Sequence, residues 1–141
     1  MKFVVAGVIK GKARPRFSGR GGYVRTYTPE TTRDYENLIR RSYTQQSNKK
    51  YEGALSIKID AFFKKNKRNK KVANTIYVLK KPDGDNIVKV VLDALNGIAY
   101  DDDKQVSKIE ITKLYSDDDN ERLEIEINEL EGLKWKALML Y

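Results

Sequence analysis

The segment from Asp85 to Asn96 restricts the possible fold more than any other part of the sequence. On a helical wheel at about 100° per residue, its polar side chains fall within one arc of roughly 100°. The remaining side chains are all aliphatic and cover the rest of the circumference. A surface helix normally carries a broad charged face. We therefore expect a nearly buried helix over residues 85–96, ended by Gly97, with its polar groups on a single stripe. The stripe consists of Asp85, Asn86, Lys89, Asp93 and Asn96.

Carboxylates on a nearly buried helix need a cation, a lysine or water close by, because an unpaired buried charge is costly. Lys89 stands one helical turn from both Asp85 and Asp93, within reach of each. Asp83 precedes the helix, where Pro82 restrains the chain and Gly84 permits a sharp turn. A structural alternative is an ion-paired helix that faces a shallow groove without any chemistry.

A second acidic group, Asp101-Asp102-Asp103, follows the helix after a short loop and precedes a predicted strand. Three adjacent aspartates often mark only a solvated turn, as Asp117-Asp118-Asp119 is expected to do. The first run differs because it lies in an apolar setting, close to the acidic stripe. With Asp83 and Asp85, one or two of its members would form a hard-oxygen site for Mg²⁺ or Mn²⁺.

The sequence contains no cysteine and no histidine. This excludes disulfide scaffolds, zinc–thiolate sites, cysteine nucleophiles, Ser-His-Asp triads and histidine general bases. An EF-hand is excluded as well, because the later glycine and the bidentate Glu are missing. A metal-bound water is then the natural nucleophile for phosphodiester hydrolysis, and Lys89 would hold the scissile phosphate or the developing charge.

Charge is divided unevenly along the chain, whose formal net charge is +8. Residues 1–81 contain 21 Lys and Arg but only 5 Asp and Glu, whereas residues 82–141 contain 7 and 15. A basic half favours a polyanionic partner such as nucleic acid. The alternative is a basic solvated surface beside acidic turns. Divalent cations between clustered carboxylates and DNA phosphates would allow an acidic half to lie against a polyanion that the basic half attracts.

The remaining pattern predicts one α+β domain over residues 1–141, with a mixed sheet and two main helices. Strands are expected at 2–9 and 54–63, with a short one near 76–79. A helix capped by Thr31 or Thr32 should run to about residue 46. Residues 106–115 and 122–129 alternate like the arms of a hairpin turning at 116–120. Residues 18–29 are expected to form a mobile loop or a loose hairpin, and the basic segment 64–71 an exposed loop. The apolar tail 132–141 should dock on the body or on a partner.

No stretch of about 18 apolar residues occurs, so no membrane span is expected, and the short apolar start does not read as a signal peptide. We expect a cytoplasmic protein without a small-molecule cofactor.

The central motifs resemble the RusA family of Holliday junction resolvases, which occurs in bacteria and their phages or prophages. The family core Lys-Pro-Asp-x-Asp-Asn-x-x-Lys stands at Lys81–Lys89, Asp-Ala-Leu-Asn-Gly at Asp93–Gly97, and Asp-Asp-x-Gln at Asp102–Gln105. Arg14-Pro15-Arg16 and Tyr27-Thr28-Pro29 also look like the family. The resemblance implies a homodimeric, Mg²⁺-dependent endonuclease that cuts four-way DNA junctions by symmetrically related nicks.

The resemblance also implies roles for individual residues. Asp83 and Asp85 match catalytic aspartates, a further one corresponds to Asp102 or Asp103, and the motif lysine corresponds to Lys89. The expected catalytic set is Asp83, Asp85, Lys89, Asp102 and Asp103, with the four aspartates as metal ligands and Asn86 and Asp93 in support. The expected DNA contacts are Arg14, Arg16, Lys64, Lys65, Lys67, Arg68 and Lys81. A nuclease for flaps or other branched DNA, and a non-catalytic basic DNA-binding module, remain alternatives.

Overall fold

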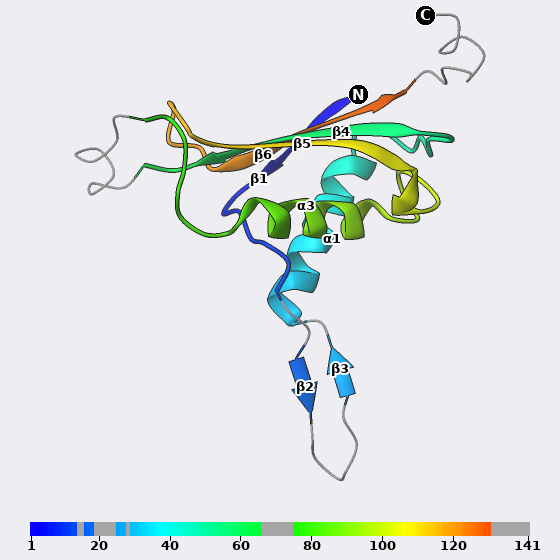
Figure 1. Ribbon diagram of the computed structural model, residues 1–141, viewed down its shortest axis with the longest axis horizontal. Coiled ribbons are helices and arrows are strands. Elements are labelled where there is room, and N and C mark those ends of the chain that lie inside the picture. The colour runs from blue at the N-terminus through cyan, green and yellow to red at the C-terminus, as the bar shows by residue number, and fades with distance from the viewer. Residues whose placement is uncertain (14–15, 19–24, 28, 66–74, 131–141) are drawn as a thin grey trace, which may run out of the picture.

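A four-stranded mixed sheet carries two helices on one face in the computed structural model, which describes residues 1–13, 16–18, 25–27, 29–65 and 75–130 (Figure 1). The strand order is β1-β6-β4-β5. The sheet elements are β1 (Lys2–Ala6), β4 (Leu55–Phe63), β5 (Val106–Tyr115) and β6 (Arg122–Glu129). The helices are α1 (Glu30–Thr44) and α3 (Gly84–Leu95), with a short 3₁₀ helix, η2 (Asp103–Gln105), before β5. This arrangement confirms the expected α+β class.

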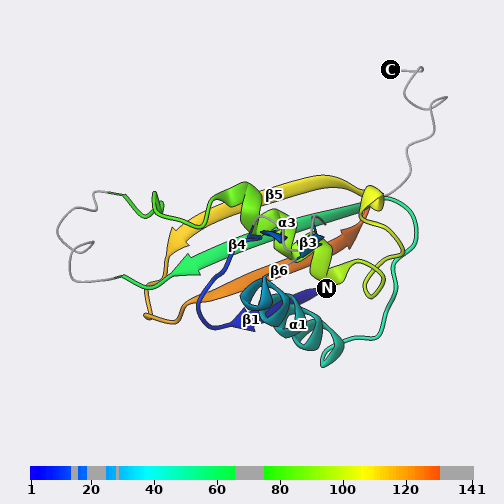
Figure 2. The same cartoon turned by 90° about the horizontal axis from the view of Figure 1, so that it is seen from below.

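The core lies between the sheet and the two helices. Strand β4 supplies it with every second residue, as the alternation in 54–63 predicted, and β6 does the same. Viewed from the helix side, α1 lies over β1 and β6, and α3 lies over β4 and β5 (Figure 2). The fully buried side chains of the two central strands are Leu55, Ile57, Ile59, Ala61, Leu123, Ile125 and Ile127.

The expected hairpin between residues 106–115 and 122–129 is wrong. Both strands form, but β4 lies between them, parallel to β5 and antiparallel to β6. Alternation predicts a strand with one buried face, but it does not identify the neighbouring strand. The most apolar strand takes the centre, where both its edges are paired. The connection 116–121 is long enough to cross the end of that strand, because neighbouring strands lie only about 4.8 Å apart.

Helix α1 begins at Glu30, and Pro29 occupies its N-cap position without a side-chain hydrogen bond. The expected cap at Thr31 or Thr32 is therefore wrong. Thr32 instead turns inward, where its hydroxyl accepts a 3.4 Å hydrogen bond from the N–H of Ala13. The carbonyl of Pro29 accepts the N–H groups of Thr32 and Arg33 at 3.1 Å, and proline suits a helix start because it has no N–H of its own to leave unpaired.

Smaller differences concern the ends of elements. β1 ends at Ala6, before Gly7 with its φ of 112°, rather than at residue 9. Around 76–79 there is no strand but a single bridge, from Tyr77 to Leu114. The short strands β2 (Arg16–Ser18) and β3 (Arg25–Tyr27) pair antiparallel, so the pairing begins two residues before the segment 18–29, for which a mobile loop or a loose hairpin was expected. The tail 132–141 and most of the basic segment 64–71 lie outside the described residues. In the part of the chain that is described, no helix has the length and apolarity to cross a membrane.

Helix α3 confirms the buried face and the polar stripe that the helical wheel predicted. Its buried residues form one continuous face against the sheet and α1, and Gly97 follows it with a φ of 81°. Val88 and Leu92, which flank that face, are only partly buried. The polar stripe is therefore held outward along the whole length of the helix. The buried face consists of Ile87, Val90, Val91, Ala94 and Leu95.

An ionic cluster joins α1 to α3. The Lys12 ammonium lies 2.6 Å from the Glu36 carboxylate and 3.2 Å from that of Asp93. Arg40 pairs with Glu36 at 3.5 Å and donates a 2.9 Å hydrogen bond to the carbonyl of Ala94. Burial lowers the pKa of Lys12, but its bonds to the two carboxylates raise it by more, so that it lies above its usual value. The cluster thus fixes the rotation of α3 against α1.

Removing the Lys12 charge while keeping its aliphatic stem, as in Lys12→Met, should destabilise the fold. The Glu36 carboxylate, with 9% of its side chain exposed, would keep only Arg40 as a partner. We expect the free energy of unfolding in urea to fall by about 1–3 kcal/mol. The control is Lys10→Met, an exposed lysine two residues earlier, which should change stability by less than about 0.5 kcal/mol. Equal stability of Lys12→Met and the wild type would show that the cluster is not holding the helices.

Candidate active site

Asp83 and Asp85 stand at the N-terminal end of α3. Asp83 is the N-cap residue, and its carbonyl accepts the backbone N–H groups of Asn86 and Ile87 at 3.1 Å. Asp85 lies in the first turn, and both aspartates are exposed. Carboxylates in this position are favoured by the positive end of the helix dipole. The helix therefore presents two charged oxygen donors to solvent at one end of its polar stripe.

A cleft of about 530 Å³ opens beside Asp83, between the start of α3, the start of α1 and the segment 10–13. The segment is held against α3 by a 2.9 Å hydrogen bond from the N–H of Lys12 to the carbonyl of Asn86. Gly11 allows this approach, because a Cβ there would lie 2.9 Å from the Cβ atoms of Asn86 and Pro82. The lining residues are Lys10, Gly11, Lys12, Ala13, Thr31, Thr32, Lys81, Pro82, Asp83 and Asn86.

Asp102 and Asp103 stand at the other end of the stripe, on η2. Asp102 caps this short helix, with its carboxylate accepting the N–H of Lys104 at 3.0 Å. The Gln105 side chain completes the cap, since its oxygen accepts the N–H groups of Asp101 and Asp102 at 3.0 and 3.1 Å. The Gln105 amide also donates to two carbonyls of the loop before β4, those of Tyr51 and Gly53. Gln105 is therefore a positioning residue for the acidic pair.

The two carboxyl groups of this pair interact directly. The backbone N–H of Lys104 and the contact with Asp103 lower the pKa of Asp102. The shared hydrogen bond with Asp102 raises the pKa of Asp103, and the nearby charge of Asp93 raises it further. Two carboxylates this close repel each other unless a proton or a cation lies between them. The pair is thus suited to bind a hard cation.

Lys89 and Asp93 connect the two ends of the stripe. Lys89 lies 3.7 Å from Asp93 and has 63% of its side chain exposed, and Asp103 lies within electrostatic range of both residues. The carboxylate of Asp93 also pairs with Lys12 at 3.2 Å, so two ammonium groups lie against it. Asp101 points elsewhere and pairs with Lys50 at 2.7 Å.

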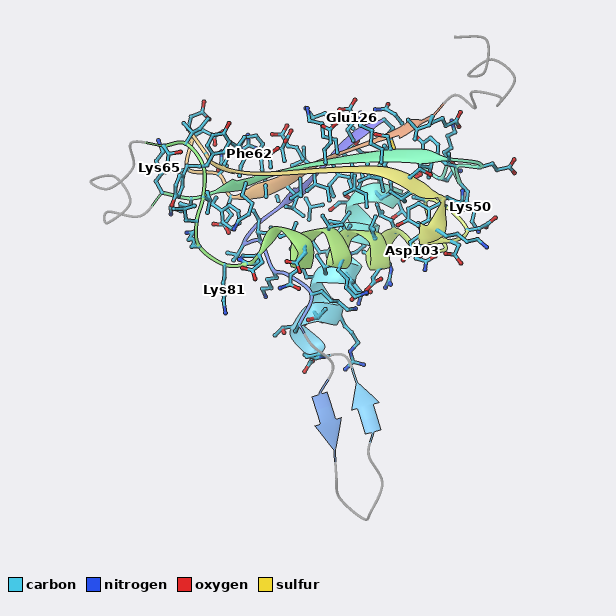
Figure 3. The ribbon with its side chains drawn as sticks, viewed as in Figure 1. Lys50, Phe62, Lys65, Lys81, Asp103 and Glu126 are labelled. Carbon is cyan, nitrogen blue, oxygen red and sulfur yellow. The ribbon has the colours of Figure 1, made fainter. Side chains whose placement is uncertain are left out.

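Within one chain, the four carboxylates of the expected metal site fall into two separate pairs. Asp103 lies at the end of α3 opposite the Lys81 turn, which leads into Asp83 and Asp85 (Figure 3). Along the helix axis, Asp85 and Asp93 are separated by about 12 Å at 1.5 Å per residue. Among the described residues, no group of three or more acidic side chains is placed to hold a metal ion. A single copy therefore does not bring the carboxylates together around one cation.

The structure describes the side chains of only some of the residues predicted to contact DNA. Lys64 and Lys65 are exposed just after β4, at one end of the sheet (Figure 3). Lys81 is exposed and lines the cleft beside Asp83. Arg16 belongs to β2, but its side chain is not described. Arg14, Lys67 and Arg68 lie outside the described residues.

Two features that position the site were not predicted from the sequence: the Lys12–Glu36 ion pair and the hydrogen bonds of Gln105. Glu36, Ile39 and Tyr43 follow the spacing of one helical face, so the pattern did contain a carboxylate on a buried face that requires a cation. For Gln105, the motif indicated importance, but the partners Tyr51 and Gly53 are distant in sequence and give no local signal.

Comparisons with known proteins identify the family of this chain. Residues 6–128 match the family described as Endodeoxyribonuclease RusA. The chain is also 30% identical to the uncharacterized protein YqaN of Bacillus subtilis (strain 168) over 141 residues, covering 94% of this chain and 98% of the relative. The family match includes both acidic groups, the polar stripe of α3 and the segment that carries Lys12. The chain belongs to the RusA endodeoxyribonuclease family.

Proposed function

We propose that this protein is a structure-selective endodeoxyribonuclease that resolves four-way DNA junctions as a homodimer. The observation that best supports the proposal is the family match across residues 6–128, which includes the motif aspartates exposed on one stripe of α3. The charge distribution agrees with a DNA substrate, because basic residues gather in the first 81 positions and the acidic groups in the remainder. A phage or prophage origin is part of the same proposal.

The proposed cofactor is Mg²⁺, with Mn²⁺ as a substitute, and its ligands would come from Asp83, Asp85, Asp102 and Asp103. When bound, such a cation supplies a water of lowered pKa and neutralises charge on the phosphate. Oxygen-only donors suit these hard cations, and a sequence without cysteine or histidine offers no softer set.

The chain's own residues would bind and orient the DNA. Lys10 and Lys81 stand on the walls of the cleft beside Asp83, where they would contact phosphates on either side of the scissile bond. Lys89 projects from the middle of the stripe with most of its side chain in solvent. It would approach the phosphate from between the two acidic groups and stabilise charge that develops there. Gln105 would keep Asp102 and Asp103 oriented while DNA binds.

Two such sites in a symmetric dimer would face the two strands that a resolvase must nick. A four-way junction has an approximate two-fold axis, and a two-fold dimer presents identical surfaces to both halves. The homodimer is therefore the assembly that this function requires.

Cleavage of a synthetic four-way junction tests the function directly. In the presence of Mg²⁺, the wild-type protein should introduce paired nicks in opposite strands. Asp85→Asn should reduce the nicking rate by about 10²-fold or more, because losing one metal ligand removes several kcal/mol of transition-state stabilisation. The measurement is single-turnover cleavage of end-labelled junctions, followed on denaturing gels.

The matched control is Asp117→Asn, the same chemical change in an exposed acidic turn, which should cleave like the wild type. Equal rates for Asp85→Asn and the wild type would remove Asp85 from the site. Tight junction binding by a wild type that never nicks would favour a non-catalytic DNA-binding module. Faster cleavage of flaps than of four-way junctions would favour a branched-DNA nuclease.

The basic segment after β4 should contribute to DNA affinity through phosphates alone. Replacing Lys64, Lys65, Lys67 and Arg68 with Ala should weaken junction binding and make its salt dependence shallower by about 0.9 in log–log slope per lost contact. Fluorescence anisotropy between low and moderate salt measures this slope. A control with the same loss of charge elsewhere replaces Lys2, Arg41, Lys49 and Lys58 with Ala. If both variants lower the slope equally, only the net charge matters and the segment forms no specific interface.

A further inference from the structure

Glu121, the last residue of the connection between β5 and β6, binds backbone N–H groups from two distant parts of the chain. Its carbonyl accepts the N–H of Gly7 at 3.0 Å. Its carboxylate accepts the N–H of Ile9 at 3.0 Å and that of Lys64 at 3.3 Å. Gly7 and Ile9 follow β1, whereas Lys64 follows β4. One side chain therefore joins the exits of two strands that are not neighbours in the sheet.

The order of the strands explains how Glu121 reaches both exits. β6 lies between β1 and β4 and is antiparallel to both, so it begins at the end of the sheet where the other two finish (Figure 2). A residue just before β6 is therefore close to both exits. The adjacent Arg122 pairs with Asp118 and Glu124, at 3.3 Å each, so its charge is engaged with other carboxylates.

Both exits carry basic residues that the proposed function assigns to DNA. Lys10 lines the cleft at the start of α3. Lys64 and Lys65 are exposed at the start of the basic segment 64–71. A carboxylate beside these lysines lowers their attraction for a polyanion. Glu121 nevertheless holds the backbone from which they project, which indicates a role in their position rather than in the charge of the surface.

The chain between β1 and α1 is held at two places, and Lys10 lies between them. On one side, the N–H of Ile9 donates to the Glu121 carboxylate. On the other side, the N–H of Lys12 donates to the carbonyl of Asn86 at 2.9 Å. Ile9 is buried, whereas Lys10 is exposed. Packing in the core thus fixes the Ile9 side chain, and the bond to Glu121 fixes the direction of the backbone that leads to Lys10.

We propose that Glu121 is a positioning residue for DNA binding, which holds the cleft wall that carries Lys10 at a fixed place relative to the basic segment that begins at Lys64. We call its two carboxylate bonds the Glu121 clamp. The assignment of these lysines to DNA rests on the proposed function, whereas the clamp does not. With both exits tied to one carboxylate, the lysines meet DNA phosphates as a preformed surface. Binding then costs less conformational entropy than if each segment were ordered separately.

Two substitutions at Glu121 separate position from charge. Glu121→Gln has the same shape but replaces one acceptor oxygen with an N–H donor, and Glu121→Asp keeps the charge but is shorter by one methylene. Each variant can keep at most one bond of the clamp. Charge alone predicts tighter junction binding by Glu121→Gln, because a negative charge beside the lysines is removed. The proposal predicts the opposite sign: both variants should bind about three- to tenfold more weakly in fluorescence anisotropy.

The matched control is Asp117→Asn, which removes the same charge from an exposed position in the same connection. It should bind the junction as tightly as the wild type or slightly more tightly. Affinities of both Glu121 variants that equal or exceed the wild-type affinity would overturn the proposal.

Two further measurements distinguish positioning from a general loss of stability. At saturating protein, the single-turnover cleavage rate of both variants should stay within about twofold of the wild-type rate, because the clamp does not touch the motif aspartates. In a background in which Lys10, Lys64 and Lys65 are replaced with Ala, the Gln substitution should weaken binding no further, since the residues that it displaces are gone. An equal loss of affinity in both backgrounds would show that Glu121 does not act through these lysines.

Amide hydrogen exchange, followed by NMR, tests the clamp in the absence of DNA. In both Glu121 variants, the N–H of Ile9 or of Lys64 should exchange at least about fivefold faster than in the wild type, while the amides of α3 exchange as before. Unchanged exchange at both positions would overturn the clamp. A wild type that binds no junction would contradict the proposed function, and the exchange rates would still decide whether Glu121 holds the two exits together.

Discussion

The burial of one face of α3 against the sheet is the constraint on which the candidate site depends. Five aliphatic residues hold this helix over β4 and β5, and the Lys12–Glu36–Asp93 cluster prevents it from rotating against α1. Every polar residue of the stripe is consequently directed to the same side. The chemistry-bearing residues are positioned by packing in the core rather than by contacts among themselves, and exposed carboxylates can be tolerated there because the buried face provides the stability.

The same constraint separates the acidic residues. One group caps the start of α3 beside a basic cleft, and the other begins β5 on a turn that Gln105 fastens to the loop before β4. Each group is therefore fixed by its own local contacts, and the length of α3 sets the distance between them.

Much of this arrangement could be predicted from the sequence. The period of residues 85–96 predicted both the buried face of α3 and its polar stripe, because a helix wheel contains all the information needed. The partners of strands could not be predicted in this way: residues 106–115 alternate as a hairpin arm would, yet β4 separates them from β6. The distance between the two acidic groups depends on where β5 lies relative to α3, which is tertiary information. Gln105 acts through carbonyls about fifty positions away, so only the structure identifies it as a positioning residue.

Anomalous diffraction from crystals grown with Mn²⁺ tests the candidate site most directly. We predict an anomalous peak coordinated by Asp83 or Asp85 together with Asp102 or Asp103. A peak whose ligands include none of these four aspartates would contradict the assignment of the metal site to the two ends of the polar stripe.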